Sequence, residues 1–238
     1  MTKEEIFQSY KQFMAVWSDD KNGRYRSYDH CRKIFLENYD NPGRDIDLIA
    51  LNLYAYLASW GMLRGSSFLL QKDYKYLIPI VEILYDFRYY KLLNYNPEEG
   101  YMQEYIGLVM KLGQEISAYL GGTEYYKIDK ITKDDNKETV PNDKDYSLTL
   151  ISKILMGTLG CTPAVDRFDM ATLSLLDSKG RKTYRFNKST FELIWKITEE
   201  HYEELKAARR EILETYKVDY PIFKVLDMCL WQSGRYFT

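Results

Sequence analysis

The chain has 238 residues and a formal net charge of −2, and 45% of its residues are hydrophobic. This length suffices for one large domain or for two small lobes that share a cleft. A general nucleic-acid binder usually carries a basic excess, because phosphate neutralisation supplies most of its non-specific affinity, so any basic face must here be local. No uninterrupted apolar run reaches membrane-spanning length, so we expect a soluble protein with no membrane partner.

The side-chain composition adds two constraints. Cys31, Cys161 and Cys229 are far apart, odd in number and form no C-x-x-C pair. With no visible signal peptide, this pattern favours reduced core thiols in a cytoplasmic protein. The 23 tyrosines are typical of partly exposed positions where helices pack against each other, or alternatively of a surface on which a base or sugar could stack.

Helical periodicity and capping signals run through most of the chain. Thr2 and Glu5 form a capping-box pattern at the start of the first helix, and Ser189 and Glu192 form a second. The helix over 46–62 is apolar almost all round and should be central. The predicted helices cover about 2–17, 28–39, 46–62, 74–93, 97–120, 146–159, 168–176, 189–216 and 222–231.

The stretch 121–145 differs from the rest of the chain because it is rich in Lys, Asp, Glu, Asn and Thr and poor in apolar residues. It predicts a long polar loop. Strand alternation is scarce throughout, and no internal repeat is evident. We therefore predict an all-α fold, with residues 1–238 forming a single helical domain of two lobes.

Asp166 is the most informative residue. It ends the run Pro163-Ala164-Val165-Asp166, which follows the apolar stretch 150–160. A buried helix that runs through a Gly-containing turn into a carboxylate can present that carboxylate at a cleft. The alternative is that Asp166 caps the helix beginning near Phe168, since Asp is common at helix starts.

Three segments carry a family resemblance. Residues 158–166 resemble the segment with the essential aspartate in the helix-hairpin-helix DNA glycosylases, where an apolar helix precedes a Pro-containing turn and an Ala/Pro-Val-Asp run. Residues 57–67 resemble the buried early segment of that superfamily, and residues 230–236 its final helix, which closes on a Gly-Arg pair. The resemblance implies a two-lobed helical fold and an N-glycosylase-type hydrolase. Asp166 would then stabilise an oxocarbenium-like sugar or orient the attacking water.

Two features of that superfamily are missing. Its hairpin grips a phosphate with a Gly-x-Gly-type turn, but residues 141–147 contain no glycine. The lysine nucleophile of its bifunctional members would fall near Thr149, and Lys144 and Lys153 are out of register. No terminal four-cysteine cluster is present, so we expect no iron–sulfur site and no other cofactor. The sequence thus predicts poor binding of duplex DNA and no lyase activity.

A second candidate segment follows the early helix. Gly61 and Gly65 would let the backbone approach a ligand closely, and Arg64 with the hydroxyls of Ser66 and Ser67 could hold an anion. The alternative is a helix–helix junction in which Arg64 pairs inside the molecule, with Asp166 or Asp227 as the first partners to check. The expected substrate-binding residues are Trp60 or Trp231 as a stacking wall, and Arg64 and Ser66 as anion contacts.

The histidines offer a weaker signal. Arg24 and His30 have an R-x5-H spacing that resembles the loose motif of the all-α HEPN ribonucleases, where both act on an RNA phosphate; alternatively, His30 is a helix-face residue. His201 falls on the apolar stripe of the 189–216 helix and should be a satisfied core histidine. With only two distant histidines we expect no metal site, and no phosphate-binding P-loop motif occurs.

The leading hypothesis is a glycosylase-like protein that acts on, or binds, a nucleobase, a nucleoside or a nucleic acid through Asp166. One rival is a binding or regulatory protein that keeps the fold without catalysis. The other is a HEPN-like ribonuclease that uses Arg24 and His30. A pocket shared by Asp166 and Arg64 would favour the first hypothesis.

Overall fold

The computed structural model describes residues 2–65, 67–93, 95–98, 100–122, 124–126, 139–141 and 148–237. The predicted all-α class is confirmed, because helices make up nearly all regular structure in these ranges. The division into two lobes stays a prediction. The α-helices are α1 (Lys3–Gln8), α2 (Tyr10–Asp19), α3 (Ser27–Glu37), α4 (Ile46–Ser59), α5 (Ile78–Leu84), α6 (Met102–Gly121), α7 (Leu148–Gly157), α8 (Arg167–Leu176), α9 (Lys188–Glu200), α10 (Tyr202–Tyr216) and α11 (Ile222–Gly234).

Four short 3-10 helices connect the longer ones. They are η1 (Arg24–Arg26), η2 (Phe68–Gln71), η3 (Tyr74–Leu77) and η4 (Phe87–Leu92). The helix expected over 74–93 is therefore three shorter elements, η3, α5 and η4, and the one expected from residue 97 begins at Met102.

The first predicted helix is broken at Ser9. The capping box is confirmed, since the Thr2 side chain accepts from the Glu5 backbone N–H and the Glu5 carboxylate accepts from the Thr2 backbone. The Ser9 hydroxyl, however, lies 2.9 Å from the Cys229 carbonyl oxygen and 3.0 Å from Ser233 Oγ. These contacts with α11 hold the chain at the point where α1 ends and α2 begins.

The long helix expected over 189–216 is also two helices, which meet at His201. Its N-cap is Asn187, whose side chain accepts from the Thr190 backbone N–H, so the second capping box was wrong. The His201 ring stacks on Phe7 with 4.0 Å between centroids. Its Nδ1 lies 3.6 Å from Glu204 Oε1, too far for a hydrogen bond, and the residue is only partly buried, so the satisfied core histidine was wrong as well.

The polar stretch after α6 contains a small antiparallel pair. Strand β1 (Glu124–Tyr126) pairs with β2 (Thr139–Pro141), with Tyr125 opposite Val140. This pair corrects the expectation of a loop over all of 121–145. The remaining residues of that stretch, 123, 127–138 and 142–145, lie outside the described residues.

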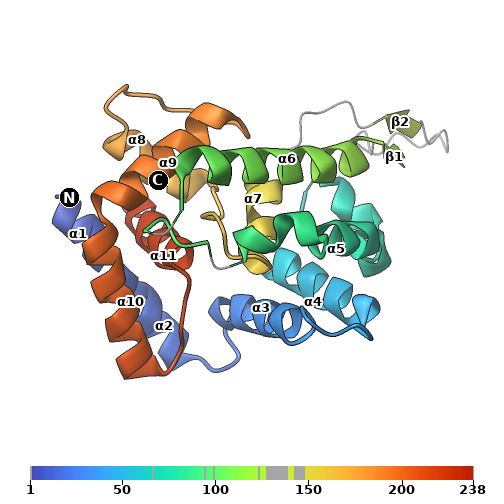
Figure 1. Cartoon of the computed structure of the whole chain (residues 1–238), viewed down its shortest axis with the longest axis horizontal. Coiled ribbons are helices and arrows are strands. Elements are labelled where there is room, and N and C mark those ends of the chain that lie inside the picture. Colours follow the sequence, from blue (N-terminus) through green and yellow to red (C-terminus); the bar gives the residue numbers. More distant parts are fainter. Residues whose placement is uncertain are drawn as a thin grey trace.

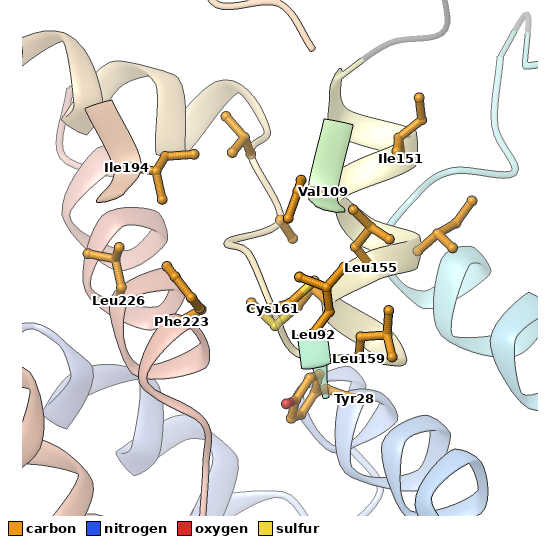
Figure 2. Packing of buried hydrophobic residues seen from close by; sticks show 14 of the residues in the cluster. Tyr28, Leu92, Val109, Ile151, Leu155, Leu159, Cys161, Ile194, Phe223 and Leu226 are labelled. Atoms are coloured by element: carbon orange, nitrogen blue, oxygen red, sulfur yellow. The ribbon is translucent and has the colours of Figure 1, made fainter. Parts of the chain in front are cut away.

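The helices enclosed on all sides are α7 and α11, and α4 is not the central element that its composition suggested. In α4, Leu48 and Leu51 are exposed, whereas nearly every side chain of α7 and all of α11 are buried. Helix α11 packs against α8, α1, α10 and α2 (Figure 1). Figure 2 shows Val109 of α6, Leu155 of α7 and Phe223 of α11 in the same buried cluster.

Candidate functional site

A cavity of about 480 Å³ lies where η1, the end of α4, the start of α8 and the end of α11 come together. Segments from both ends and the middle of the chain therefore form its wall. The lining residues are Arg24, Ala58, Ser59, Trp60, Gly61, Met62, Arg64, Thr149, Asp166, Arg167, Phe168, Trp231 and Arg235.

Asp166 both caps a helix and opens into this cavity. Its Oδ1 accepts a hydrogen bond of 2.9 Å from the Phe168 backbone N–H, and its own backbone N–H donates to Asp169 Oδ2 at 3.1 Å. These two bonds form a capping box at the start of α8. The side chain keeps 18% of its surface exposed. The two sequence interpretations, a helix cap and a carboxylate at a cleft, therefore both apply to Asp166.

Lys153 is the cation that holds this carboxylate. Its Nζ lies 3.3 Å from Asp166 Oδ2, and only 3% of the Lys153 side chain is exposed. It stands in the middle of apolar helix α7, behind the cavity wall, with its Nζ 5.4 Å from the centre of the Trp60 ring. In the sequence, Lys153 stands out only as a lysine out of register with the nucleophile of the glycosylase superfamily. A lone charge in an apolar run needs a partner, and that was the signal for this contact.

Asp169 lies beneath Asp166 and is fully buried. Burial raises the pKa of the Asp169 carboxyl well above its usual range, and the neighbouring negative charges of Asp166 and Asp227 act in the same direction. Its Oδ1 has no hydrogen-bond partner within the described ranges. The neutral form of Asp169 is therefore favoured, and Asp166 is the neighbouring carboxyl group that lines the cavity.

Arg64 shares the cavity with Asp166, but the expected pairing in the interior was wrong. Arg64 is exposed, and no carboxylate of the described residues forms an ion pair with it. Gly61, with φ of +75°, turns the chain so that the Arg64 side chain folds back over it. The other proposed partner, Asp227, pairs instead with Lys224 Nζ at 2.7 Å. Ser66 lies outside the described residues.

Two tryptophans line the cavity at right angles. The ring centres of Trp60 and Trp231 are 5.5 Å apart at 90°. The guanidinium of Arg24 lies 5.1 Å from the first ring centre and 5.8 Å from the second, and Arg235 lies 5.2 Å from that of Trp231. The Trp60 Nε1 donates to Ser27 Oγ at 3.0 Å, which fixes its ring. A base stacked on either indole would compete with a guanidinium for the ring face.

The charges on the cavity wall are strongly unequal. Among the described residues, four arginines line it and Asp166 is the one lining carboxylate. Each of these arginines is exposed, and none forms an ion pair with a carboxylate in the part of the chain that the structure describes. A basic face in a chain of net charge −2 has to be local, and this cavity is such a face. The four residues are Arg24, Arg64, Arg167 and Arg235.

The proposed Arg24–His30 pair does not form a site at this cavity. Arg24 lines the cavity, whereas His30 is exposed on α3 and is not among the lining residues. Arg24 faces the indoles of Trp60 and Trp231 instead, so its spacing from His30 in the sequence does not indicate what Arg24 contacts. This arrangement gives the HEPN-like alternative no support from geometry.

No group of three His, Cys, Asp or Glu side chains that could hold a metal ion occurs within the described ranges. Among the helices described, none combines the length and the apolar character needed to cross a membrane. Comparison of the chain with protein-family models, with curated proteins and with solved structures finds no significant match.

Proposed function

We propose that this chain is a glycosylase-like protein that binds a ligand carrying a nucleobase on a sugar and cleaves the N-glycosidic bond, with Asp166 as the essential carboxylate. The observation that carries the proposal is the position of Asp166 in an arginine-lined cavity walled by two indoles. The three segments that resemble the helix-hairpin-helix glycosylases all contribute to that wall, through Trp60, Asp166 and Trp231.

The chemistry needs one negative charge close to the sugar. The bond between C1′ and the base nitrogen breaks, and its electron pair leaves with the base. Positive charge then develops at C1′ and the ring oxygen, where the Asp166 carboxylate stabilises it. Water adds to C1′ and loses a proton to solvent, and the departing base takes up a proton at its nitrogen, which gives a neutral free base and a sugar with a hydroxyl at C1′. Lys153 keeps the carboxylate in place through the contact with Oδ2.

A binding protein without turnover is the second candidate, and one observation favours it. Both oxygens of Asp166 already have partners, since Oδ1 accepts from the Phe168 N–H and Oδ2 lies against Lys153. A carboxylate committed to a helix cap and an ion pair is less available to a transition state. In this case the cavity would recognise the same ligand without cleaving it.

Measurement of base release distinguishes the two candidates. Wild type and Asp166→Asn are incubated with nucleosides, nucleotides, and single- and double-stranded oligonucleotides that contain each base, and free bases are measured by chromatography with mass detection. We expect release by wild type and a loss of about 100-fold or more in the variant, with ligand binding retained. Asp19→Asn is the matched control, because Asp19 is exposed at the end of α2.

Two other outcomes would also distinguish cleavage by Asp166 from binding without cleavage. Equal base release by Asp166→Asn and wild type would overturn the role of Asp166. Ligand binding by both proteins without any release would establish the binding protein instead.

A further inference from the structure

The four arginines of the cavity come from four different elements, yet converge on one space. Arg24 lies on η1, Arg64 follows α4, Arg167 begins α8 and Arg235 is the C-cap of α11. Their convergence is thus a product of the tertiary fold rather than of a basic run in the sequence. Like charges gathered in this way repel one another, so an anion that binds among them relieves the repulsion.

The arginines have donors left for such an anion. Arg24 lies against the indoles of Trp60 and Trp231, and Arg167 lies over the Phe168 ring at 4.5 Å. Ring contacts orient a guanidinium and leave its N–H groups free. Arg235 donates one long hydrogen bond of 3.4 Å to the Tyr25 hydroxyl. A guanidinium held at its flat face and open at its N–H edge is suited to bind phosphate oxygens.

The charge of the wall also indicates which phosphate compound fits. A phosphodiester in a nucleic-acid strand carries a single negative charge, and the next phosphates lie further along the backbone, outside the same small volume. A terminal phosphate carries about −1.5 to −2 at neutral pH, and a diphosphate brings more charge into the same small volume. Four guanidiniums around a cavity of about 480 Å³ match the charge of a compact di- or triphosphate better than that of a phosphodiester backbone.

We propose that the cavity binds the terminal di- or triphosphate of a free nucleotide, with the phosphates held among Arg24, Arg64, Arg167 and Arg235. The proposal rests on the proposed function for the nucleoside half of the ligand and names its substrate class. The arginines are exposed, whereas Asp166 retains 18% exposure on the inner wall. The phosphates therefore occupy the outer part of the cavity, and the sugar lies next to Asp166.

Inorganic pyrophosphate is the first probe, because it contains no base and no glycosidic bond. Its binding to the full chain is measured by calorimetry at low and at physiological salt, for wild type, Arg24→Gln, Arg235→Gln and the combined variant. We expect each single change to raise the Kd about threefold to tenfold and the combined change to raise it further. Arg210→Gln is the matched control, since Arg210 is exposed on α10 away from the cavity, and its Kd should match that of wild type.

Competition then separates the ligand classes. A nucleoside diphosphate should displace pyrophosphate, while adenosine and a single-stranded or duplex oligonucleotide of equal base concentration should not. The proposal is overturned if pyrophosphate fails to bind at millimolar concentration, if the combined variant binds it as wild type does, or if an oligonucleotide is the better competitor. Unchanged melting temperatures of the variants show that they are folded, as expected for exposed side chains.

The two proposals fail in different ways. Pyrophosphate binding without base release from any substrate would leave the nucleotide site standing and remove the glycosidic activity. Base release from unphosphorylated nucleosides without pyrophosphate binding would support the glycosidic activity and overturn the phosphate site.

Discussion

Lys153 Nζ lies 3.3 Å from Asp166 Oδ2, and this ion pair joins the middle of α7 to the N-cap of α8 directly behind the cavity wall. The lysine is enclosed, whereas the aspartate reaches the cavity. The pair therefore couples the packing of the core to the position of Asp166 on the cavity wall.

Replacement of Lys153 by Met should show this coupling. Met fills a similar volume but leaves the Asp166 carboxylate without its cation, so we expect the free energy of unfolding to fall by about 1–3 kcal/mol, less than for a fully buried pair. Urea unfolding of Lys153→Met, Asp166→Asn and the double variant measures it. The double-mutant cycle should give a coupling of about 1–2 kcal/mol, and strictly additive effects would refute a direct interaction.

Asp169→Asn should change how stability depends on pH. Burial and the charges of Asp166 and Asp227 raise the pKa of Asp169 in the folded chain, whereas the unfolded chain ionises it near about pH 4. Unfolding above that pH therefore releases a proton, so the wild type loses stability as pH rises toward the folded pKa. Asn removes this proton but keeps an oxygen for the Asp166 backbone N–H. The melting temperature of Asp169→Asn should accordingly fall less than that of wild type from about pH 5 to about pH 8; parallel pH curves for the two proteins would contradict it.

Gly234 should tolerate no side chain. An added Cβ would stand 1.9 Å from the Phe168 carbonyl oxygen, because α11 crosses the start of α8 at this point. Gly234→Ala should lower the free energy of unfolding by about 2 kcal/mol or more, since backbone rather than a flexible side chain would have to move. Gly107→Ala is the control: no atom lies within 4 Å of the new Cβ in α6. There the change should stabilise by about 0.5–1 kcal/mol, and calorimetric melting curves measure both.

The three thiols should react slowly in the folded protein. Burial raises the pKa of Cys31, Cys161 and Cys229 to about 12, so few thiolates form at neutral pH. A disulfide reagent such as Ellman's should modify all three only after denaturation. Stoichiometric modification of native protein within minutes would show that at least one thiol is accessible.

The sequence predicted those helices best whose ends depend on local signals. The expected ranges 46–62, 168–176 and 222–231 correspond to α4, α8 and α11 within a few residues. The breaks at Ser9 and His201 were missed because distant contacts cause them. Ser9 bonds to α11, and the His201 ring stacks on Phe7, neither of which a local pattern can reveal.

The candidate site was predictable in part. The Pro turn before Asp166 correctly indicated a carboxylate at a cavity, and Arg64 lines the same cavity. The buried partner of Arg64 was wrong because the chain turns at Gly61 and the Arg64 side chain lies exposed over that turn, an arrangement that residue composition does not reveal. No local pattern places Arg167 at the cavity, since only the tertiary fold brings it to the other three arginines.

The contact between Ser9 and Ser233 has a consequence for the order of folding. Their hydroxyl oxygens lie 3.0 Å apart although 224 positions separate them along the chain. Closing so long a loop costs conformational entropy before its contacts stabilise the chain, which slows the docking of α11 against the N-terminal helices. Because α11 supplies Trp231 and Arg235 is its C-cap, the cavity is complete only once that helix has docked. Ligand binding should therefore return with the last phase of refolding, after the bulk of the helical signal has already recovered.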